Sequence, residues 1–328
     1  MKIDKHWTRV AFALAAIGLL VASASEARAA FTNDLLATDL NTGTVFAFDQ
    51  LTGASHGSFA TVVNPRGIAI GPDGNVYVNS SVTNNILKYS GTTGALLSTF
   101  VPSGDHGLGL AYGMQFGPNG QLYVASFTTN NILEYNGSTG AFIQAIGAGS
   151  PLTGPAGISF GPDGNLYVAG STSGPNGEIL RFNPNTGAYI GLFGPPVLQI
   201  SGLAFGGGHL FVAAGSPGSS AIGVLDATTG AFQSSLNDSA HLLTPGGLAV
   251  GSNGNLFAAS YGNSRIVSYT VTGGGTLAFN SSFTAPGLSG PIYLAVLAVP
   301  EPSSVALMGI GAFGLAGFAL RRKSRSAA

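Results

Sequence analysis

A pattern of twelve residues recurs along the middle of the chain and restricts the folds that it can adopt. Residues 67–78 read GIAIGPDGNVYV, and close copies stand at 113–124 and 157–168. Two weaker copies begin at Gly202 and Gly247, so successive copies start 46, 44, 45 and 45 residues apart. A period of this length is typical of repeat architectures, in which each copy forms one small unit of structure.

Turn signals divide each copy into four short strands. GIAI predicts a small first strand, NVYV a second strand rich in β-branched and aromatic residues, and ILKY and ALLSTF the third and fourth. A tight turn joins the first two strands, because glycine adopts the required positive φ without strain. These turns are Asp73-Gly74, Asn119-Gly120, Asp163-Gly164 and Asn253-Gly254. Four antiparallel strands every 45 residues or so are typical of a β-propeller blade.

Six blades of this length fill residues 30–298, although only five complete copies are visible. The stretch 35–54 matches the second and third strands and the following turn, but it lacks a first strand. Residues 292–296 form a lone apolar segment that supplies the missing strand. We therefore predict an all-β, six-bladed propeller whose last blade is shared between the two ends and buries the last sheet edge. Large aromatic residues of the second strands should pack between blades, namely Tyr77, Tyr123, Tyr167, Phe211 and Phe257.

The repeat resembles the NHL-type propeller family. Residues 65–69 and 73–78 match the core motif of that family, and the resemblance covers most of residues 34–298. It implies a six-bladed propeller but no single function, since NHL-like propellers include binding platforms and several unrelated enzymes.

Residues 1–29 have the three parts of a secretory signal peptide. A basic start precedes an apolar run at 10–21, and Ala27 and Ala29 are small residues at the positions that a signal peptidase reads. Cleavage is expected after Ala29, with Ala24 as a second site and an uncleaved anchor as the alternative. We therefore predict an exported protein, and the absence of cysteine excludes disulfides and thiol chemistry.

Residues 299–328 have the features of a second targeting signal. A short linker precedes an uncharged span at 305–320, and basic residues follow at once. Together these parts resemble the PEP-CTERM sorting signal of Gram-negative bacteria that make exopolysaccharide. The resemblance implies an inner-membrane-anchored precursor facing the periplasm, which an exosortase processes for release to the cell surface or matrix. A plain membrane anchor is the alternative. The residues concerned are Val299, Pro300, Glu301 and Pro302 in the linker and Arg321, Arg322 and Lys323 in the tail.

The loops that precede the first strands should surround one mouth of the propeller's central channel. They contain few side chains of the kinds that catalyse reactions or bind metals. Arg66 is their only charged residue, and the four histidines of the propeller are widely spaced. We therefore predict no catalytic, metal or cofactor site, although Asp105-His106 is an acid–imidazole pair. The loops are 64–66, 111–112, 154–156, 199–201, 244–246 and 289–291.

Charge and composition limit the classes of partner that the chain can bind. Residues 30–298 contain four basic and ten acidic residues, which disfavours binding to nucleic acid or to a polyanionic polysaccharide. We predict a non-enzymatic interaction scaffold of the bacterial envelope, with an exosortase, exopolysaccharide or other envelope proteins as partners. A degenerate lyase or lactonase and a neutral-glycan-binding adhesin are the alternatives.

Processing at both ends can be measured on the protein recovered from a host that has an exosortase. Trp7, the one tryptophan, lies in the signal peptide, so the surface form should show tyrosine emission alone. Its intact mass should place the new C-terminus between residues 299 and 302, whereas Glu301→Ala should leave a membrane-bound chain of full C-terminal length. A wild-type surface form that still carries residues 321–328 would show that the segment is a plain anchor.

Overall fold

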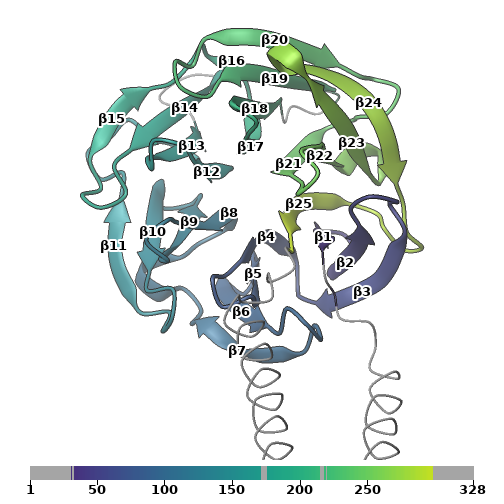
Figure 1. Cartoon of the computed structure of the whole chain (residues 1–328). Coiled ribbons are helices and arrows are strands. Elements are labelled where there is room, and N and C mark those ends of the chain that lie inside the picture. The colour runs from purple at the N-terminus through teal and green to yellow at the C-terminus, as the bar shows by residue number, and fades with distance from the viewer. Residues whose placement is uncertain (1–30, 32, 171–175, 215–217, 219, 298–328) are drawn as a thin grey trace, which may run out of the picture.

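The chain forms a six-bladed β-propeller (Figure 1). The computed structural model describes residues 31, 33–170, 176–214, 218 and 220–297. Each blade is an antiparallel sheet of four strands, and one blade has an additional short strand, β16. The predicted fold class is therefore confirmed. The predicted signal peptide and sorting segment lie outside the described residues. Among the residues that the structure describes, no helix is long and apolar enough to cross a membrane.

The blades follow one another along the chain, and in each of the first five the chain runs from the innermost strand outward. Blade 1 contains β4 (Pro65–Ile70), β5 (Val76–Ser80), β6 (Asn85–Tyr89) and β7 (Leu96–Val101). Blade 2 contains β8 (Ala111–Phe116), β9 (Leu122–Ser126), β10 (Asn131–Tyr135) and β11 (Phe142–Ile146). Blade 3 contains β12 (Ile158–Phe160), β13 (Leu166–Gly170), β14 (Asn176–Phe182) and β15 (Tyr189–Leu192), with β16 (Val197–Leu198) paired to β14. Blade 4 contains β17 (Ile200–Gly206), β18 (His209–Ala214), β19 (Ala221–Asp226) and β20 (Phe232–Asn237). Blade 5 contains β21 (Pro245–Val250), β22 (Leu256–Ser260), β23 (Arg265–Thr272) and β24 (Thr276–Phe283).

The sixth blade joins the two ends of the propeller, as the sequence predicts. It contains β25 (Pro291–Val296) as its innermost strand, followed outward by β1 (Asp34–Asp39), β2 (Thr44–Asp49) and β3 (Ser55–Thr61). β25 pairs with β1 in an antiparallel register that places Leu35 opposite Val296. The N–H groups of Ser289 and Gly290 donate to Asp39 Oδ2 at 2.6 and 2.9 Å. The ring therefore closes without an unpaired edge at this joint.

The innermost strands are small because they crowd around the axis. A Cβ atom on Gly113 would stand 2.7 Å from the carbonyl oxygen of Ala156 in the next blade. A Cβ on Gly157 would stand 2.8 Å from the Cα of Gly202, and one on Gly202 would stand 2.5 Å from the carbonyl oxygen of Gly246. These distances are shorter than side-chain contacts in proteins, so glycine permits the close approach of successive blades.

Aromatic side chains fill the space between blades farther from the axis. The Tyr77 ring lies 4.9 Å from Phe116 of blade 2, and the Tyr123 ring lies 5.0 Å from Phe160 of blade 3, both edge-on. Tyr167 repeats this contact with Phe205 of blade 4 at 4.8 Å. Edge-to-face pairs of this kind add to the free energy of apolar burial. All five aromatic residues that the repeat singles out are buried.

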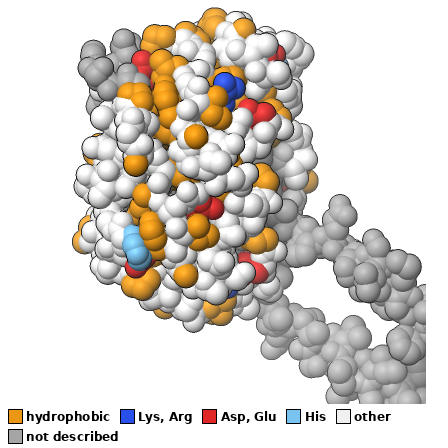
Figure 2. All heavy atoms as spheres, turned by 90° about the vertical axis from the view of Figure 1, so that its left-hand side faces the viewer, with side chains coloured by type: hydrophobic (Ala, Val, Ile, Leu, Met, Phe, Trp, Pro, Cys, Tyr) orange, Lys and Arg blue, Asp and Glu red, His pale blue; other side chains and the backbone are white. Residues whose placement is uncertain are grey.

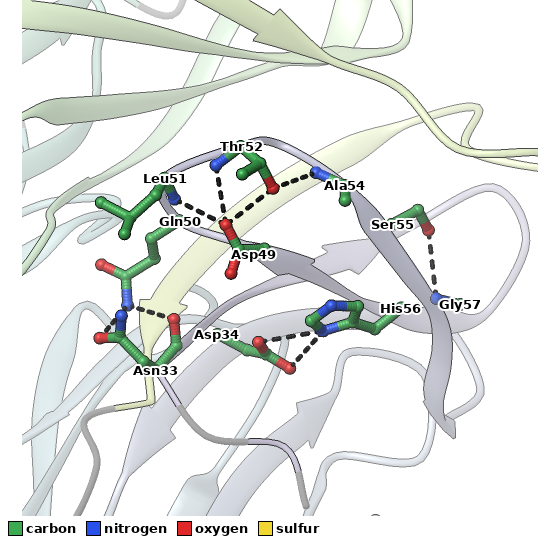
Figure 3. A network of polar contacts seen from close by, with 10 residues as sticks. All are labelled: Asn33, Asp34, Asp49, Gln50, Leu51, Thr52, Ala54, Ser55, His56 and Gly57. Atoms are coloured by element: carbon green, nitrogen blue, oxygen red, sulfur yellow. Dashed lines mark hydrogen bonds and ion pairs between the residues drawn. The ribbon is translucent and has the colours of Figure 1, made fainter. Parts of the chain in front are cut away.

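Polar contacts hold the opposite end of the closing blade (Figure 3). Asp49 Oδ1 accepts hydrogen bonds from the N–H groups of Leu51 and Thr52, and His56 Nδ1 faces both carboxylate oxygens of Asp34 at 3.1 Å. Burial raises the pKa of Asp34, and His56 opposes that rise. The N–H of Leu297 donates to the Asp34 carbonyl oxygen at 2.8 Å. The C-terminal strand therefore leaves the propeller at this end.

The closure predicts that β25 is required for a cooperative fold. A chain of residues 30–286 lacks this strand and exposes the edge of β1, so it should melt at a lower temperature and more broadly than a chain of residues 30–298. Equal melting curves in thermal denaturation would contradict the closure.

A pair of point variants distinguishes the contribution of ring closure to the free energy of unfolding from the contribution of a turn. Asp39→Ala removes the acceptor of four backbone N–H groups, two of them from the C-terminal segment, and should lower the free energy of unfolding by roughly 3 kcal/mol. Asp49→Ala is the matched control, because Asp49 caps a similar turn but its hydrogen bonds stay within that turn.

Candidate functional site

A cavity of about 620 Å³ opens at one mouth of the central channel. Residues that precede or begin the innermost strand of every blade contribute to its lining. A second cavity of about 320 Å³ follows the innermost strands along the axis. The mouth cavity is within the size range of small-molecule sites.

Six equivalent positions of the repeat surround the mouth, and they have diverged. Each is the residue directly before the first glycine of its copy, or before the residue that replaces that glycine in the sixth blade. Blades 1 and 2 carry large side chains at this position, whereas blades 3 to 5 carry small ones. In blade order they are Arg66, Tyr112, Ala156, Ser201, Gly246 and Ile292.

Arg66 and Tyr112 form one wall of the cavity. The guanidinium carbon of Arg66 lies 4.3 Å from the centre of the Tyr112 ring, a cation–π contact. The Tyr112 ring in turn lies 5.0 Å from Phe127, with the two planes inclined by 31°. Arg66, Tyr112 and Phe127 therefore form a layered wall of one cation and two aromatic rings.

Tyr293 occupies the position that glycine holds in the other five blades. It follows Gly247 by 46 residues, and the earlier copies are 44 to 46 residues apart. It is buried, it lines the cavity, and burial raises its pKa while the nearby charge of Arg66 lowers it. Tyr293 was not predicted as a site residue, although its interval from Gly247 was a signal that could have revealed it.

Five of the six predicted mouth loops contribute to the cavity. Arg66, Tyr112, Gln199 and Thr244 are among their contributions, whereas the loop at 289–291 does not line it and its place is taken by Ile292 and Tyr293. Leu40, Phe127 and Tyr261 also line the cavity, and they were missed because they follow other strands of their blades.

The histidines lie away from the cavity and bind local partners. His106 Nδ1 lies 2.9 Å from Asp105 and its ring stacks on Phe142, and His241 makes the corresponding contacts with Asp238 and Phe279. His56 pairs with Asp34, and His209 Nδ1 lies 2.6 Å from the Gln233 side chain. Within residues 31–297, wherever the structure describes them, no three His, Asp or Glu residues gather as metal ligands would.

The predicted turn residues lie at the face opposite to the mouth, where they serve the fold. Asp73, Asn119, Asp163 and Asn253 each accept a hydrogen bond from the N–H two residues later, and the glycines that follow them have φ between 73 and 79°. Asp73 also accepts a hydrogen bond from the Tyr77 hydroxyl at 3.0 Å and pairs with Lys88 at 2.8 Å. Burial alone would raise the pKa of Asp73, but hydrogen bonds from Lys88, Asn75 and Tyr77 outweigh it and lower the pKa from 3.8 to about 2.

The outer wall presents few charges. Figure 2 shows the side formed by β11 and β15, where isolated acidic and basic groups lie among uncharged polar side chains and scattered apolar ones. No basic surface for a polyanion is visible on that side.

The C-terminal segment matches a known family. A family model of the PEP-CTERM protein-sorting motif covers residues 298–323, directly after the last described residue, Leu297. The chain therefore carries this motif, and the motif indicates export and exosortase processing of a membrane-anchored precursor. The roles of residues 299–302 and 321–323 in that processing remain predictions, and these residues lie outside the described part of the structure.

Several solved structures of enzymes are similar to this chain in architecture. A catalytically inactive virginiamycin B lyase from Staphylococcus aureus with quinupristin shares 16% identity, with 81% of this chain and 92% of that chain covered and a TM-score of 0.56. A gluconolactonase from Xanthomonas campestris shares 16% identity over 70% of this chain and 78% of that chain, also at 0.56. The aldose sugar dehydrogenase of Streptomyces coelicolor shares 18% identity, with 72% of this chain and 85% of that chain covered and a TM-score of 0.53. A search of curated proteins found no match. These similarities show the propeller fold alone.

The lowered pKa of Asp73 predicts a defined pH dependence. An aspartate whose folded pKa lies below its unfolded value stabilises the fold above pH 3.8 and loses that effect as the pH falls toward 2. The melting temperatures of wild type and Asp73→Asn should therefore differ at pH 6 and converge by pH 2. Asp163→Asn should behave in the same direction but more weakly, since Arg181 lies 3.9 Å from Asp163. A wild-type advantage that persists at pH 2 would contradict the assignment.

Proposed function

We propose that the chain is a non-enzymatic binding component of the bacterial surface or extracellular matrix, and that its channel mouth is the binding site. The PEP-CTERM motif supports the route to the surface. A neutral-glycan-binding adhesin is one form of this proposal.

The lining of the mouth cavity carries the proposal. No Asp, Glu or His is found among the described residues that line it, so the general acids and bases that most hydrolases and lyases use are not at hand. Its walls instead combine aromatic, apolar and uncharged polar residues with one guanidinium, a composition typical of ligand-binding pockets.

The direction in which the chain leaves the propeller favours the same function. Leu297 lies at the end of β25 that is opposite to the mouth, and the sorting motif begins at the next residue. The described chain therefore ends at the face opposite to the mouth, and the mouth is not the face to which the sorting motif is joined. An opening on the face opposite to this junction suits a site that binds partners.

The alternative is a lyase or lactonase, the activities named for two of the similar structures. The two functions differ in metal dependence. A metal that binds the native state stabilises it by mass action, so chelation should lower the melting temperature of such an enzyme. We expect no change on chelation, and a drop that Ca²⁺ or Zn²⁺ restores would favour the enzyme.

Filling the cavity tests the proposal directly. Ala156→Trp places a large ring in the mouth, and the fraction of protein retained on cells and matrix of an exosortase host should fall about tenfold relative to the fraction in the medium. Ser138→Trp is the control, because Ser138 is an exposed turn residue between β10 and β11. Melting curves must show that both variants are folded. Wild-type retention of a folded Ala156→Trp protein would overturn the proposal.

A further inference from the structure

We propose that the mouth cavity binds a ligand in which a carboxylate is attached to a ring, with Arg66 as the anchor of the carboxylate. This inference rests on the proposed function, because it names the chemistry that the same cavity recognises. Three observations carry it: the asymmetry of the mouth, the unpaired guanidinium and the aromatic walls.

The mouth is asymmetric although the repeat that builds it is regular. Arg66, Tyr112 and Ile292 are the large residues at the position before the glycine, and they belong to blades 1, 2 and 6, which are neighbours in the ring (Figure 1). Tyr293 follows Ile292 and adds a second large side chain on blade 6. The small residues Ala156, Ser201 and Gly246 occupy equivalent positions on blades 3 to 5. Space for a ligand therefore lies across the axis from the cation.

Arg66 is a cation without a counter-ion. Among the residues that the structure describes, no carboxylate lies within ion-pair distance of Arg66, and its buried Nε has no hydrogen-bond partner. Lys88 and Arg181, in contrast, each pair with an aspartate. Arg181 and Arg265 also have an unpaired Nε, but neither of them lines the cavity. A buried donor without an acceptor is unfavourable, and a carboxylate matches the fork of guanidinium donors.

The position of Arg66 is fixed before any ligand arrives. The buried hydroxyl of Thr38 donates to the Arg66 carbonyl oxygen at 2.7 Å, and the N–H of Tyr293 donates to the same hydroxyl at 3.2 Å. The guanidinium rests on the Tyr112 ring, which is supported by Phe127. Binding therefore costs little side-chain ordering at the anchor.

The walls indicate what is attached to the carboxylate. Tyr261, Phe127 and Tyr293 line the cavity, and no acidic residue among the described lining residues would repel the ligand. Aromatic walls favour a ring with an apolar face, either the C–H face of a sugar or an aromatic ring. Two sources fit this shared chemistry, a uronic acid unit of a polysaccharide and a free aromatic carboxylate.

The net charge of the propeller limits how many carboxylates it accepts. Residues 30–298 contain ten acidic and four basic residues, so a long polyanion is repelled outside the mouth. We therefore expect a single carboxylate to bind, with an affinity that falls as ionic strength rises.

Calorimetric titration of the purified protein tests the inference with matched ligands. Methyl glucuronide and 4-hydroxybenzoate carry the carboxylate, and methyl glucoside and 4-hydroxybenzyl alcohol are their neutral counterparts. We expect one or both carboxylates to bind, each about tenfold or more tightly than its counterpart, and Arg66→Gln to abolish that preference. Arg181→Gln is the control, since Arg181 is a partly exposed cation outside the cavity.

The outcomes distinguish the two sources of the ligand, and they also distinguish this inference from the proposed function. Binding of the glucuronide alone assigns the site to a polysaccharide unit, and binding of 4-hydroxybenzoate alone assigns it to a free aromatic acid. Failure of both carboxylates to bind, or equal binding by a folded Arg66→Gln protein, overturns this inference. The proposed function then still stands if the Ala156→Trp variant loses retention on the cells.

Discussion

The antiparallel pairing of β25 with β1 is the contact on which the rest of the propeller depends. It joins residues more than 250 positions apart, and it is the only pairing in the described structure that links the two ends of the propeller. Thr38 and Asp39 reinforce it from the N-terminal side by binding the backbone of Tyr293, Ser289 and Gly290. Because the same Thr38 hydroxyl binds the Arg66 carbonyl, closure of the ring also fixes one edge of the mouth.

Close packing at the axis explains why the mouth can vary while the fold does not. In blades 1 to 5 the innermost glycines approach the backbone of the next blade too closely for a side chain, so the geometry of the ring fixes those positions. The residue before each glycine faces the mouth, and a side chain is excluded there only in blade 5, where a Cβ on Gly246 would overlap the Ile292 carbonyl oxygen. Arginine, tyrosine, alanine, serine, glycine and isoleucine all occur there. A regular scaffold thus carries an irregular site, as is common for loops and strand ends placed on rigid folds.

The fold could be predicted from the sequence because the repeat encodes it several times. Turn glycines, aromatic second strands and small first strands agree in five copies, and the lone segment at 292–296 completed the sixth blade. The site was predicted only in part. The loops ahead of the first strands were identified, but Phe127 and Tyr261 follow second strands, whose antiparallel pairing with the first strands brings their ends to the mouth. The hydrogen bonds of Asp73 to Tyr77 and Lys88 likewise join neighbouring strands in a register that only the folded sheet defines. The NHL-type resemblance remains a prediction, since the family match covers only the C-terminal motif.

Arg66 is unusual because charged residues are scarce in this chain. A chain with 8% charged residues builds its propeller mainly from backbone hydrogen bonds and aromatic contacts, and the ion pairs within the described residues are isolated ones. Lys88 and Arg181 sit near the turn face and pair with turn aspartates, where they stabilise the hairpins. Arg66 lies at the other end, on the face turned away from the segment that carries the sorting motif. This half-buried guanidinium has a stacking partner in Tyr112 but no anion among the described residues, and the proposed role in ligand recognition rests on that difference.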